Sequence, residues 1–492
     1  MKRILRLFLS RTAFILLLLL LQIMLFFVLI EYFSQFPYIN TVFYAISIMI
    51  VLYLVSSDGD PNYKISWIIP ILLFPLFGGL FYLFYRQRNI SKKTLDAHLK
   101  IDQDRISYVQ NEMISESRTA HYLNTLNWPA YDQTKTEFLG SGEIMFERMK
   151  EDLKEAKSFI FLEFFIIKKG VMWDELLSIL KEKVSNGVKV KLIFDDFGSS
   201  ELPLNFSKKL REFGIDVKVF NKMKLHLNFG MNYRDHRKIC VIDGKVGYTG
   251  GINIADEYIN LKSPFGHWLD IGLRIEGSAV WSLTLGFLEN YRFTHKKDID
   301  YNDFKIDFKQ DDDGVVIPFT DTPLDNNPSS KLTYLQMIHG ATKFIYITTP
   351  YLIIDSEISN ALKLASISGV DVRIIIPYIP DKKIVYMVTE SYVPDLLKYG
   401  IKVYKYKPGF IHAKLMVTDN EKAMIGTVNF DYRSFYLHFE NSIYLENSSA
   451  IHQMTSFFLN TVEKSVPFED LKKPNLIYIL LQQFFKGFSS LL

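Results

Sequence analysis

Two short strings in the sequence carry the same arrangement of chemically active side chains. "DHRKICVIDG", beginning at position 235, and "IHAKLMVTDN", beginning at position 411, both contain the pattern H-x-K-x-x-x-x-D. The residues concerned are His236, Lys238, Asp243, His412, Lys414 and Asp419. Each histidine is followed 17 positions later by an asparagine, Asn253 in the first copy and Asn429 in the second. A single such pattern arises by accident in unrelated chains, but two copies with matching asparagine spacing are a strong signal.

These residue types suit transfer chemistry at a phosphodiester. Positions i and i+2 of a strand share a face, so each histidine points the same way as its lysine. If the two copies face each other, two imidazoles and two ammonium groups meet in one cleft. The lysines then balance the phosphate charge, and the asparagine amides donate to its oxygens. One neutral imidazole attacks phosphorus while the other protonates the departing alkoxide, which predicts two steps through a phosphohistidine.

The two aspartates are expected to position the site. Asp243 and Asp419 lie seven positions after their histidines, so on an ideal strand they face the other way. Asp243-Gly244 and Asp419-Asn420 are typical of hairpin turns.

Each histidine also needs a carboxylate that fixes its tautomer. The candidates are Asp270 in the first copy, within "HWLDIGL", and Glu440 in the second, within "FYLHFENS". Cys240 is the only cysteine, which excludes a disulfide framework and a thiolate metal site. No metal-ligand spacing is present, and the proposed chemistry requires no metal ion or other cofactor.

Both strings lie in a repeated α/β unit. "WDELLSILKEKVSNG" places Trp173, Leu176 and Leu180 on one helical face and ends at Gly187, before the strand-like "VKVKLIFDD". "SEISNALKLASISG" ends in the same way at Gly369, before "VDVRIIIP". Because the same succession of elements precedes both histidines, the sequence predicts a duplicated domain rather than a solenoid.

The N-terminal region is expected to be embedded in a membrane. Hydrophobic segments occupy positions 12–30, about 39–55 and about 65–85, and the first is long enough to cross a bilayer. Basic residues flank this region, at Lys2, Arg3, Arg6, Arg11, Arg86, Arg88, Lys92 and Lys93. The positive-inside rule assigns both clusters to the cytoplasm, which three full spans cannot satisfy. Two spans plus one half-embedded segment can, and the sequence leaves open which segment does not cross.

Composition argues for a lipid substrate and against nucleic acid. Hydrophobic residues make up 48% of the 492 residues and aromatic residues 15%, while the net charge is only +3. A nucleic-acid-binding chain would carry a basic stripe. The C-terminal "NLIYILLQQFFKGFSSLL" fits two interpretations equally, a helix on the membrane surface or a final helix packed on the core.

The sequence resembles the bacterial cardiolipin synthases of the phospholipase D superfamily. The resemblance rests on both H-x-K strings, on "HWLDIGLRIEGSAV" and on "WIIPILLFPLFGGLFYLFY". It implies an α/β fold of tandem, pseudo-twofold phospholipase D-type domains, with mixed sheets flanked by helices, behind a helical membrane region. The expected division is a membrane region at 1–90, a linker at 91–135, and phospholipase D-type domains at 136–312 and 313–492.

The resemblance also implies a reaction and a location. Two phosphatidylglycerols react to give cardiolipin and glycerol, and the family's catalytic His, Lys and Asp correspond to the six residues named first. The expected protein is a multi-pass cell-membrane enzyme with cytoplasmic catalytic domains, acting on phosphatidylglycerol among anionic membrane lipids. Its oligomeric state is not indicated. The alternatives are a membrane-bound phospholipase D, or a related phosphodiesterase using water or another alcohol as acceptor, and a non-catalytic scaffold.

Overall fold

The computed structural model describes residues 24, 27–28, 31–32, 36–58, 60–74, 78–79, 82, 92–109, 114–222, 232–295, 298–325 and 327–491. Most of the first hydrophobic segment lies outside these residues, and so do the basic residues at positions 2, 3, 6, 11, 86 and 88. Lys92 and Lys93 begin helix α6.

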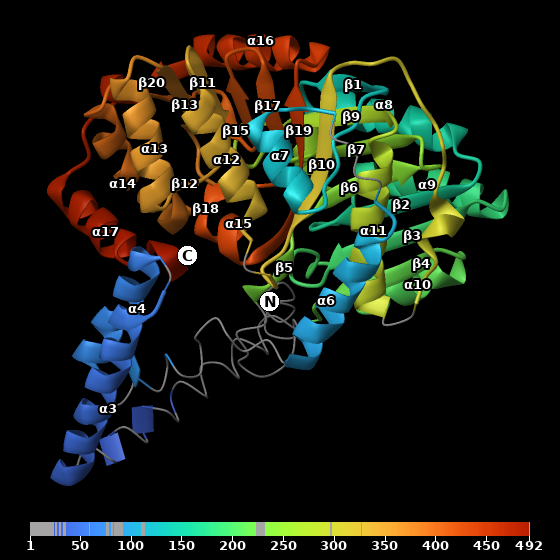
Figure 1. The fold of residues 1–492 in the computed structure, drawn as a ribbon. Helices are drawn as coiled ribbons and strands as arrows, with labels where there is room; N and C mark the ends of the chain where they lie inside the picture. Colours follow the sequence, from blue (N-terminus) through green and yellow to red (C-terminus); the bar gives the residue numbers. More distant parts are fainter. Residues whose placement is uncertain are drawn as a thin grey trace, which may run out of the picture.

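Two apolar helices represent the N-terminal region. Helix α3 (Pro37–Ser56) coincides with the second hydrophobic segment, and α4 (Pro61–Leu73) contains the beginning of the third. The carboxylate of Asp60 caps α4 by accepting from the N–H groups of Asn62 and Tyr63 at 2.7 and 3.2 Å. Within the described ranges, none of the helices is both long and apolar enough to cross a bilayer. In Figure 1 the two helices project from the rest of the molecule.

The stretch expected as a linker contains two helices. These are α6 (Lys92–Ile106), which lies along α11 (Val280–His295), and α7 (Arg118–Thr125), which lies against α12 (Ser329–Gly340) (Figure 1). Arg105 of α6 is buried, stacks on Trp128 at 4.0 Å and donates to the carbonyl oxygen of Asn127 at 3.0 Å. This stretch therefore packs on both halves of the body.

The first half of the body is a seven-stranded mixed sheet with the order β1-β9-β7-β6-β2-β3-β4. Its strands are β1 (Thr134–Leu139), β2 (Phe159–Phe164), β3 (Lys189–Asp195), β4 (Asp216–Phe220), β6 (Lys238–Ile242), β7 (Val246–Gly250) and β9 (Gly272–Gly277). Its other helices are α8 (Gly142–Glu155), α9 (Val171–Ser185) and α10 (Phe206–Glu212).

The second half repeats this order as β10-β19-β17-β16-β11-β13-β14, followed by β20. Its strands are β10 (Val315–Asp321), β11 (Phe344–Thr348), β13 (Asp371–Pro377), β14 (Lys402–Tyr406), β16 (Leu415–Thr418), β17 (Lys422–Gly426), β19 (His438–Glu446) and β20 (Ser465–Pro467). Its other helices are α13 (Ser356–Ile367), α14 (Lys383–Leu397), α15 (Tyr432–Tyr436), α16 (Ser449–Glu463) and α17 (Leu476–Lys486). The same strand order in both halves confirms the predicted duplication.

The predicted local elements are also confirmed. Helix α9 buries Trp173, Leu176 and Leu180, and Gly187 follows it with φ of +86°. Gly369, after α13, has φ of +99°. These left-handed conformations suit glycine and end each helix just before a parallel strand.

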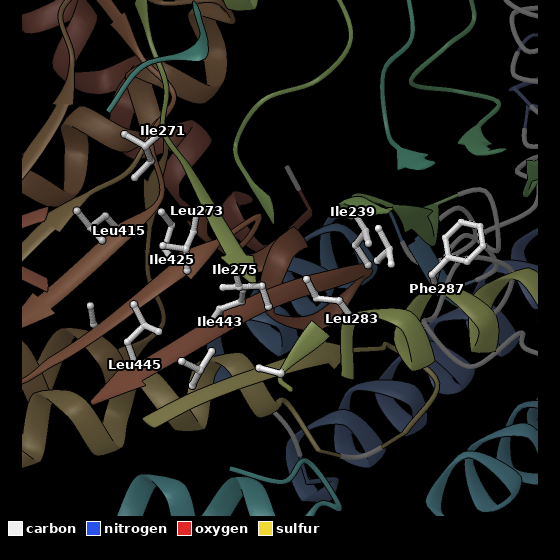
Figure 2. Packing of buried hydrophobic residues seen from close by; sticks show 14 of the residues in the cluster. Ile239, Ile271, Leu273, Ile275, Leu283, Phe287, Leu415, Ile425, Ile443 and Leu445 are labelled. Carbon is white, nitrogen blue, oxygen red and sulfur yellow. The ribbon is translucent and has the colours of Figure 1, made fainter. Parts of the chain in front are cut away.

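One hydrophobic core joins the two halves. Figure 2 shows buried side chains of the first half, among them Ile239, Leu273, Ile275 and Phe287, in one cluster with Leu415, Ile425, Ile443 and Leu445 of the second. Burying one such side chain fully contributes about 1.5–3 kcal/mol. Because many side chains are buried there, the two sheets are fixed relative to each other, and so is any site formed between them.

Candidate active site

Two short strand pairs connect the halves and position the histidines. Strand β5 (Arg234–Asp235) pairs with β19, and β15 (Gly409–Ile411) pairs with β8 (His267–Leu269). His236 follows β5 directly, and its backbone N–H donates to the carbonyl oxygen of Phe439 at 2.8 Å. His412 follows β15, and its N–H donates to the carbonyl oxygen of Leu269 at 2.7 Å. Each histidine therefore lies beside a strand of the opposite half.

The histidine–carboxylate pairs are crosswise, which means that each histidine pairs with a carboxylate from the other half of the chain. His236 Nδ1 lies 3.0 and 2.9 Å from the two carboxylate oxygens of Glu440. His412 Nδ1 lies 2.6 Å from Oδ2 of Asp270. Both carboxylates are fully buried. A carboxylate beside Nδ1 keeps the proton on that nitrogen and leaves the Nε2 lone pair available for chemistry. Asp270 and Glu440 were expected near the histidines, but the sequence did not indicate that each serves the histidine of the other copy.

The two lysines are buried in the same place. Lys238 Nζ donates to the carbonyl oxygen of His236 at 2.6 Å, and Lys414 Nζ donates in the same way to that of His412. Burial lowers the pKa of Lys238 to about 8 and that of Lys414 to about 7, against the attraction of Glu440 and Asp270. Such lowered values mean that an anion entering the site would find poorly hydrated positive charges.

Both imidazoles are neutral at pH 7 in the empty site. Burial, and then the charges of Lys238 and Lys414, lower the pKa of His236 well below 6.5. Burial and Lys414 lower the pKa of His412 to about 4, although Asp270 opposes them. A neutral imidazole is a nucleophile, and a bound phosphodiester anion would raise the pKa of its partner toward the range of an acid catalyst.

Aromatic rings enclose the two imidazoles. The ring of Phe165 lies edge-on to His236 with centroids 5.1 Å apart. Tyr258 and Trp268 flank His412 at 5.5 and 5.2 Å. The sequence analysis did not identify these three residues as part of the site. Phe165 follows β2, Tyr258 lies in a short 3-10 helix (Asp256–Ile259) and Trp268 lies in β8, and no local pattern specifies that they meet the histidines.

The two asparagines differ in their surroundings. Asn253 Oδ1 accepts from the N–H of Ile166 at 3.0 Å, and its Nδ2 donates to the hydroxyl of Tyr258 at 2.7 Å. Asn253 therefore orders the loop after β2 and the ring beside His412. Among the described residues, the buried Oδ1 of Asn429 has no hydrogen-bond partner, and the backbone N–H of Asn429 donates to Ser434 Oγ at 3.1 Å. The expectation that both amides donate to phosphate stays a prediction.

Asp243 and Asp419 lie in hairpin turns, as expected. Asp243 joins β6 to β7, and its carboxylate accepts from the N–H groups of residues 157, 158 and 159 at 2.7, 2.7 and 2.9 Å. Asp419 accepts from those of residues 342, 343 and 344 at 2.7–2.8 Å. Burial alone would raise the pKa of Asp419, but these donors lower it below its ordinary value. Both aspartates therefore fasten the motif hairpin to the start of β2 or β11, rather than contacting the histidines.

The substitution Asp243→Asn should destabilise the fold as well as reduce activity. It removes a charged acceptor of three backbone N–H groups, and a hydrogen bond to a charged group is worth about 1.5–3 kcal/mol. Chemical unfolding followed by intrinsic fluorescence measures the change. Lys238→Met is the matched control, because it should leave stability nearly unchanged while turnover collapses. A fully stable but inactive Asp243→Asn enzyme would make this carboxylate a direct participant.

A third histidine lies beside the pair formed by His236 and Glu440. The imidazole of His438 is 5.4 Å from that of His236, and its Nδ1 is 3.6 Å from Glu440 Oε1. Arg433 Nε donates to His438 Nε2 at 3.4 Å. Burial lowers the pKa of His438 to about 3, so it is neutral. Thr427 also donates to Glu440, so this carboxylate is fixed from three sides. His438 was not predicted from the sequence, although its place two positions before Glu440, in "HFE", is a signal that could have indicated it.

Within the part of the chain that the structure describes, His236, His438 and Glu440 are the group whose ligand atoms could surround a metal ion. A metal ion there would displace the proton of His236 Nδ1 and add charge beside Lys238 and Lys414. Activity should therefore survive dialysis against a chelator. Assays with and without EDTA test this, and a loss that only one divalent ion restores would overturn the metal-free mechanism.

The chain is similar to known proteins over most of its length. Residues 149–264 and 334–462 match a family described as cardiolipin synthase, PLD-like domain. Residues 42–87 match a family described as phospholipase D-nuclease N-terminal. A Streptococcus mutans protein described as uncharacterized is 41% identical over 84% of this chain and 93% of its own. A cardiolipin synthase of Halalkalibacterium halodurans is 35% identical over 90% of this chain and 91% of its own.

A solved structure supports the fold alone. The phosphatidylserine synthase of Haemophilus influenzae superimposes with a TM-score of 0.58 at 16% sequence identity, covering 76% of this chain and 97% of its own.

Proposed function

The chain belongs to the cardiolipin synthase family of the phospholipase D superfamily, and we propose that it transfers a phosphatidyl group from one phosphatidylglycerol to another. The products are cardiolipin and glycerol. The observation that carries this proposal is the pairing of two buried histidines with buried carboxylates beside two buried lysines.

In the first step, Nε2 of His236 attacks phosphorus and forms a P–N bond while the bond from phosphorus to the glycerol oxygen breaks. The negative charge of the bound phosphodiester raises the pKa of His412, which takes up a proton from solvent and then gives it to the departing glycerol. Lys238 and Lys414 stabilise the negative charge that builds on the phosphoryl oxygens. Glu440 stabilises the positive charge that develops on His236.

In the second step, a hydroxyl group of another phosphatidylglycerol attacks the phosphohistidine. His412, now neutral, takes the hydroxyl proton while the P–N bond breaks. His236 is again neutral, and His412 returns the proton to solvent when cardiolipin leaves, so the cycle consumes no cofactor. The role of each residue in these steps is part of the proposal.

The acceptor separates this proposal from its alternatives. A membrane-bound phospholipase D or a related phosphodiesterase would use the same residues with water or another alcohol as acceptor, and a scaffold would not react. Phosphatidylglycerol labelled in its acyl chains, given to the purified enzyme in vesicles, tests all three. Cardiolipin with free glycerol supports the proposal. Phosphatidic acid identifies the hydrolase, and unchanged lipid the scaffold.

The value of kcat/KM should decline on the alkaline side and stay level on the acid side. The pKa of Lys414 is about 7 and that of Lys238 about 8, so their charges are lost as the pH rises through those values. The pKa of His236 lies well below 6.5 and that of His412 is about 4, so protonation of the histidines should not reduce activity near pH 6.5. In kcat the alkaline decline should move upward, because the bound anion favours charged lysines. A kcat/KM that rises steadily to high pH would contradict a requirement for charged lysines.

We also propose the location and domain division that the sequence predicted. Residues 1–90 would be a multi-pass anchor in the cell membrane, followed by a connecting region at 91–135. The two phospholipase D-type domains, at 136–312 and 313–492, would lie on the cytoplasmic side among anionic lipids. The family match at residues 42–87 and the exposed apolar side chains of α3 support an anchored enzyme.

A further inference from the structure

The apolar face of helix α17 points away from the protein body, and its polar face points toward the body. Its outward stripe consists of Ile477, Leu480, Leu481 and Phe484, whose exposed fractions are 70%, 61%, 43% and 60%. These positions are spaced i, i+3, i+4 and i+7, which defines one face of a helix. In a helix that packs on a water-soluble body, this apolar stripe would face the core. In α17 the stripe faces away from the body. Four neighbouring apolar side chains therefore form one exposed surface, which differs from a single exposed apolar residue.

Polar side chains attach the opposite face of α17 to the body. The hydroxyl of Tyr478 donates to Glu390 Oε2 at 2.7 Å, and Gln482 Nε2 donates to the same oxygen at 3.4 Å. Lys486 Nζ donates to the carbonyl oxygen of Ser391 at 3.2 Å. Gln482 is buried, whereas its apolar neighbours are exposed. These contacts with α14 fix the direction in which the apolar stripe points.

The end of the chain after α17 is attached to the N-terminal helices. Ser66 Oγ of α4 donates to the carbonyl oxygen of Gly487 at 2.9 Å and lies 2.9 Å from Ser490 Oγ. Leu491 packs on the cluster that contains Trp67 and Ile71. Helices α3 and α4 also carry exposed apolar side chains, including Leu52, Val55, Leu72 and Leu73, at 63%, 63%, 51% and 67%. In Figure 1 α4 lies just below the end of α17, and it contacts the short 3-10 helix Ser489–Leu491 that follows α17. The apolar stripe of α17 and the exposed apolar side chains of α3 and α4 therefore belong to segments that are attached to each other.

We infer that α17 lies in the surface of an anionic bilayer, with its apolar stripe at the boundary between headgroups and acyl chains. Ile477, Leu480, Leu481 and Phe484 enter the acyl region, and the exposed Lys472 and Lys473 just before the helix meet the anionic headgroups. The occupant is a lipid surface rather than a second protein copy, because the chain end after α17 is attached to α4, in a region that also exposes apolar side chains, and because two exposed lysines precede the helix. This surface is separate from the histidine–lysine site, so its test does not depend on the reaction.

A fluorescent probe in the stripe tests this inference in the full-length enzyme. Leu480→Cys is labelled with an environment-sensitive dye, and the protein is reconstituted into vesicles of phosphatidylglycerol and phosphatidylcholine with brominated acyl chains. Ser456→Cys is the matched control, because Ser456 is exposed on α16, which lies at the end of the body opposite α3 and α4 (Figure 1). The unaltered chain checks that Cys240, which is buried, takes up no dye.

The expected result is bromolipid quenching that is at least about threefold stronger at position 480 than at position 456. Cross-linking of the Leu480→Cys enzyme in the same vesicles tests the other occupants. Efficient cross-linking between copies without lipid quenching would assign the stripe to a second copy and overturn the inference. Neither quenching nor cross-linking would also overturn it, because the stripe would then face water or another segment of this chain. Turnover of a soluble phosphodiester, unchanged in both variants, verifies the fold.

Discussion

His236→Ala should lose essentially all phosphatidyl transfer, by about four orders of magnitude or more. The nucleophile that forms the phosphohistidine is then absent, and removing the nucleophile of a covalent enzyme typically lowers kcat by 10⁴–10⁶. His412→Ala should fail to a similar extent with phosphatidylglycerol, because glycerol is a poor leaving group that needs a proton. Initial rates of glycerol release in vesicles measure both losses. The natural substrate therefore does not separate the two roles.

An aryl phosphodiester separates them, because an aryl alcohol leaves without protonation. With that substrate His412→Ala should still form the intermediate on His236 and release one equivalent of aryl alcohol in a burst. It should then stop, since no base activates the acceptor. His236→Ala should give no burst. The adduct is located by peptide mapping under alkaline conditions, since phosphohistidine is acid-labile. A burst from His236→Ala with the adduct on His412 would reverse the assignment, and adducts in both variants would mean that either histidine attacks.

Glu440→Gln should impair formation of the phosphohistidine, and Asp270→Asn should impair its consumption. The reason is the crosswise pairing, in which Glu440 supports His236 and Asp270 supports His412. Replacing the carboxylate behind a catalytic histidine by its amide stabilises the wrong tautomer and can lower kcat by about 10⁴. With the aryl substrate, Glu440→Gln should slow the burst itself. Asp270→Asn should leave the burst fast and slow only the turnover after it.

Double variants provide the control for this second prediction. Glu440→Gln should add little to the loss caused by His236→Ala, because the two residues act as one unit. Asp243→Asn serves as a carboxylate control that lies outside both pairs. If Asp270→Asn slowed the burst while Glu440→Gln spared it, each carboxylate would serve the histidine of its own half in the working enzyme.

Much of the fold was predictable because local patterns specify it. The apolar spacing of α9, the glycines at positions 187 and 369, and the turn residues after β6 and β16 depend on neighbours in sequence. The same holds for the turn position of Asp243 and Asp419. The repeated histidine–lysine pattern also indicated that both copies contribute to one site.

The crosswise pairing could not be predicted from such patterns. It depends on β5 and β15, strands of two and three residues whose partners lie in the other half. Strands this short carry no periodicity that selects a partner. The sequence also could not show which way the apolar face of α17 points. A helical period shows that an apolar face exists but not whether it faces protein or lipid. The burial of Arg105, which lies in the expected linker, was not predictable either, because it arises from tertiary packing.

The wide sequence separation of the two histidine–carboxylate pairs has a consequence during synthesis. His236 and Glu440 are 204 residues apart, and His412 and Asp270 are 142 apart. A ribosome-bound chain that has reached only residue 400 contains neither complete pair. His236, the proposed nucleophile, receives its carboxylate only after position 440 has been translated. Nascent chains that have not reached Glu440 are therefore expected to be unable to cleave lipid.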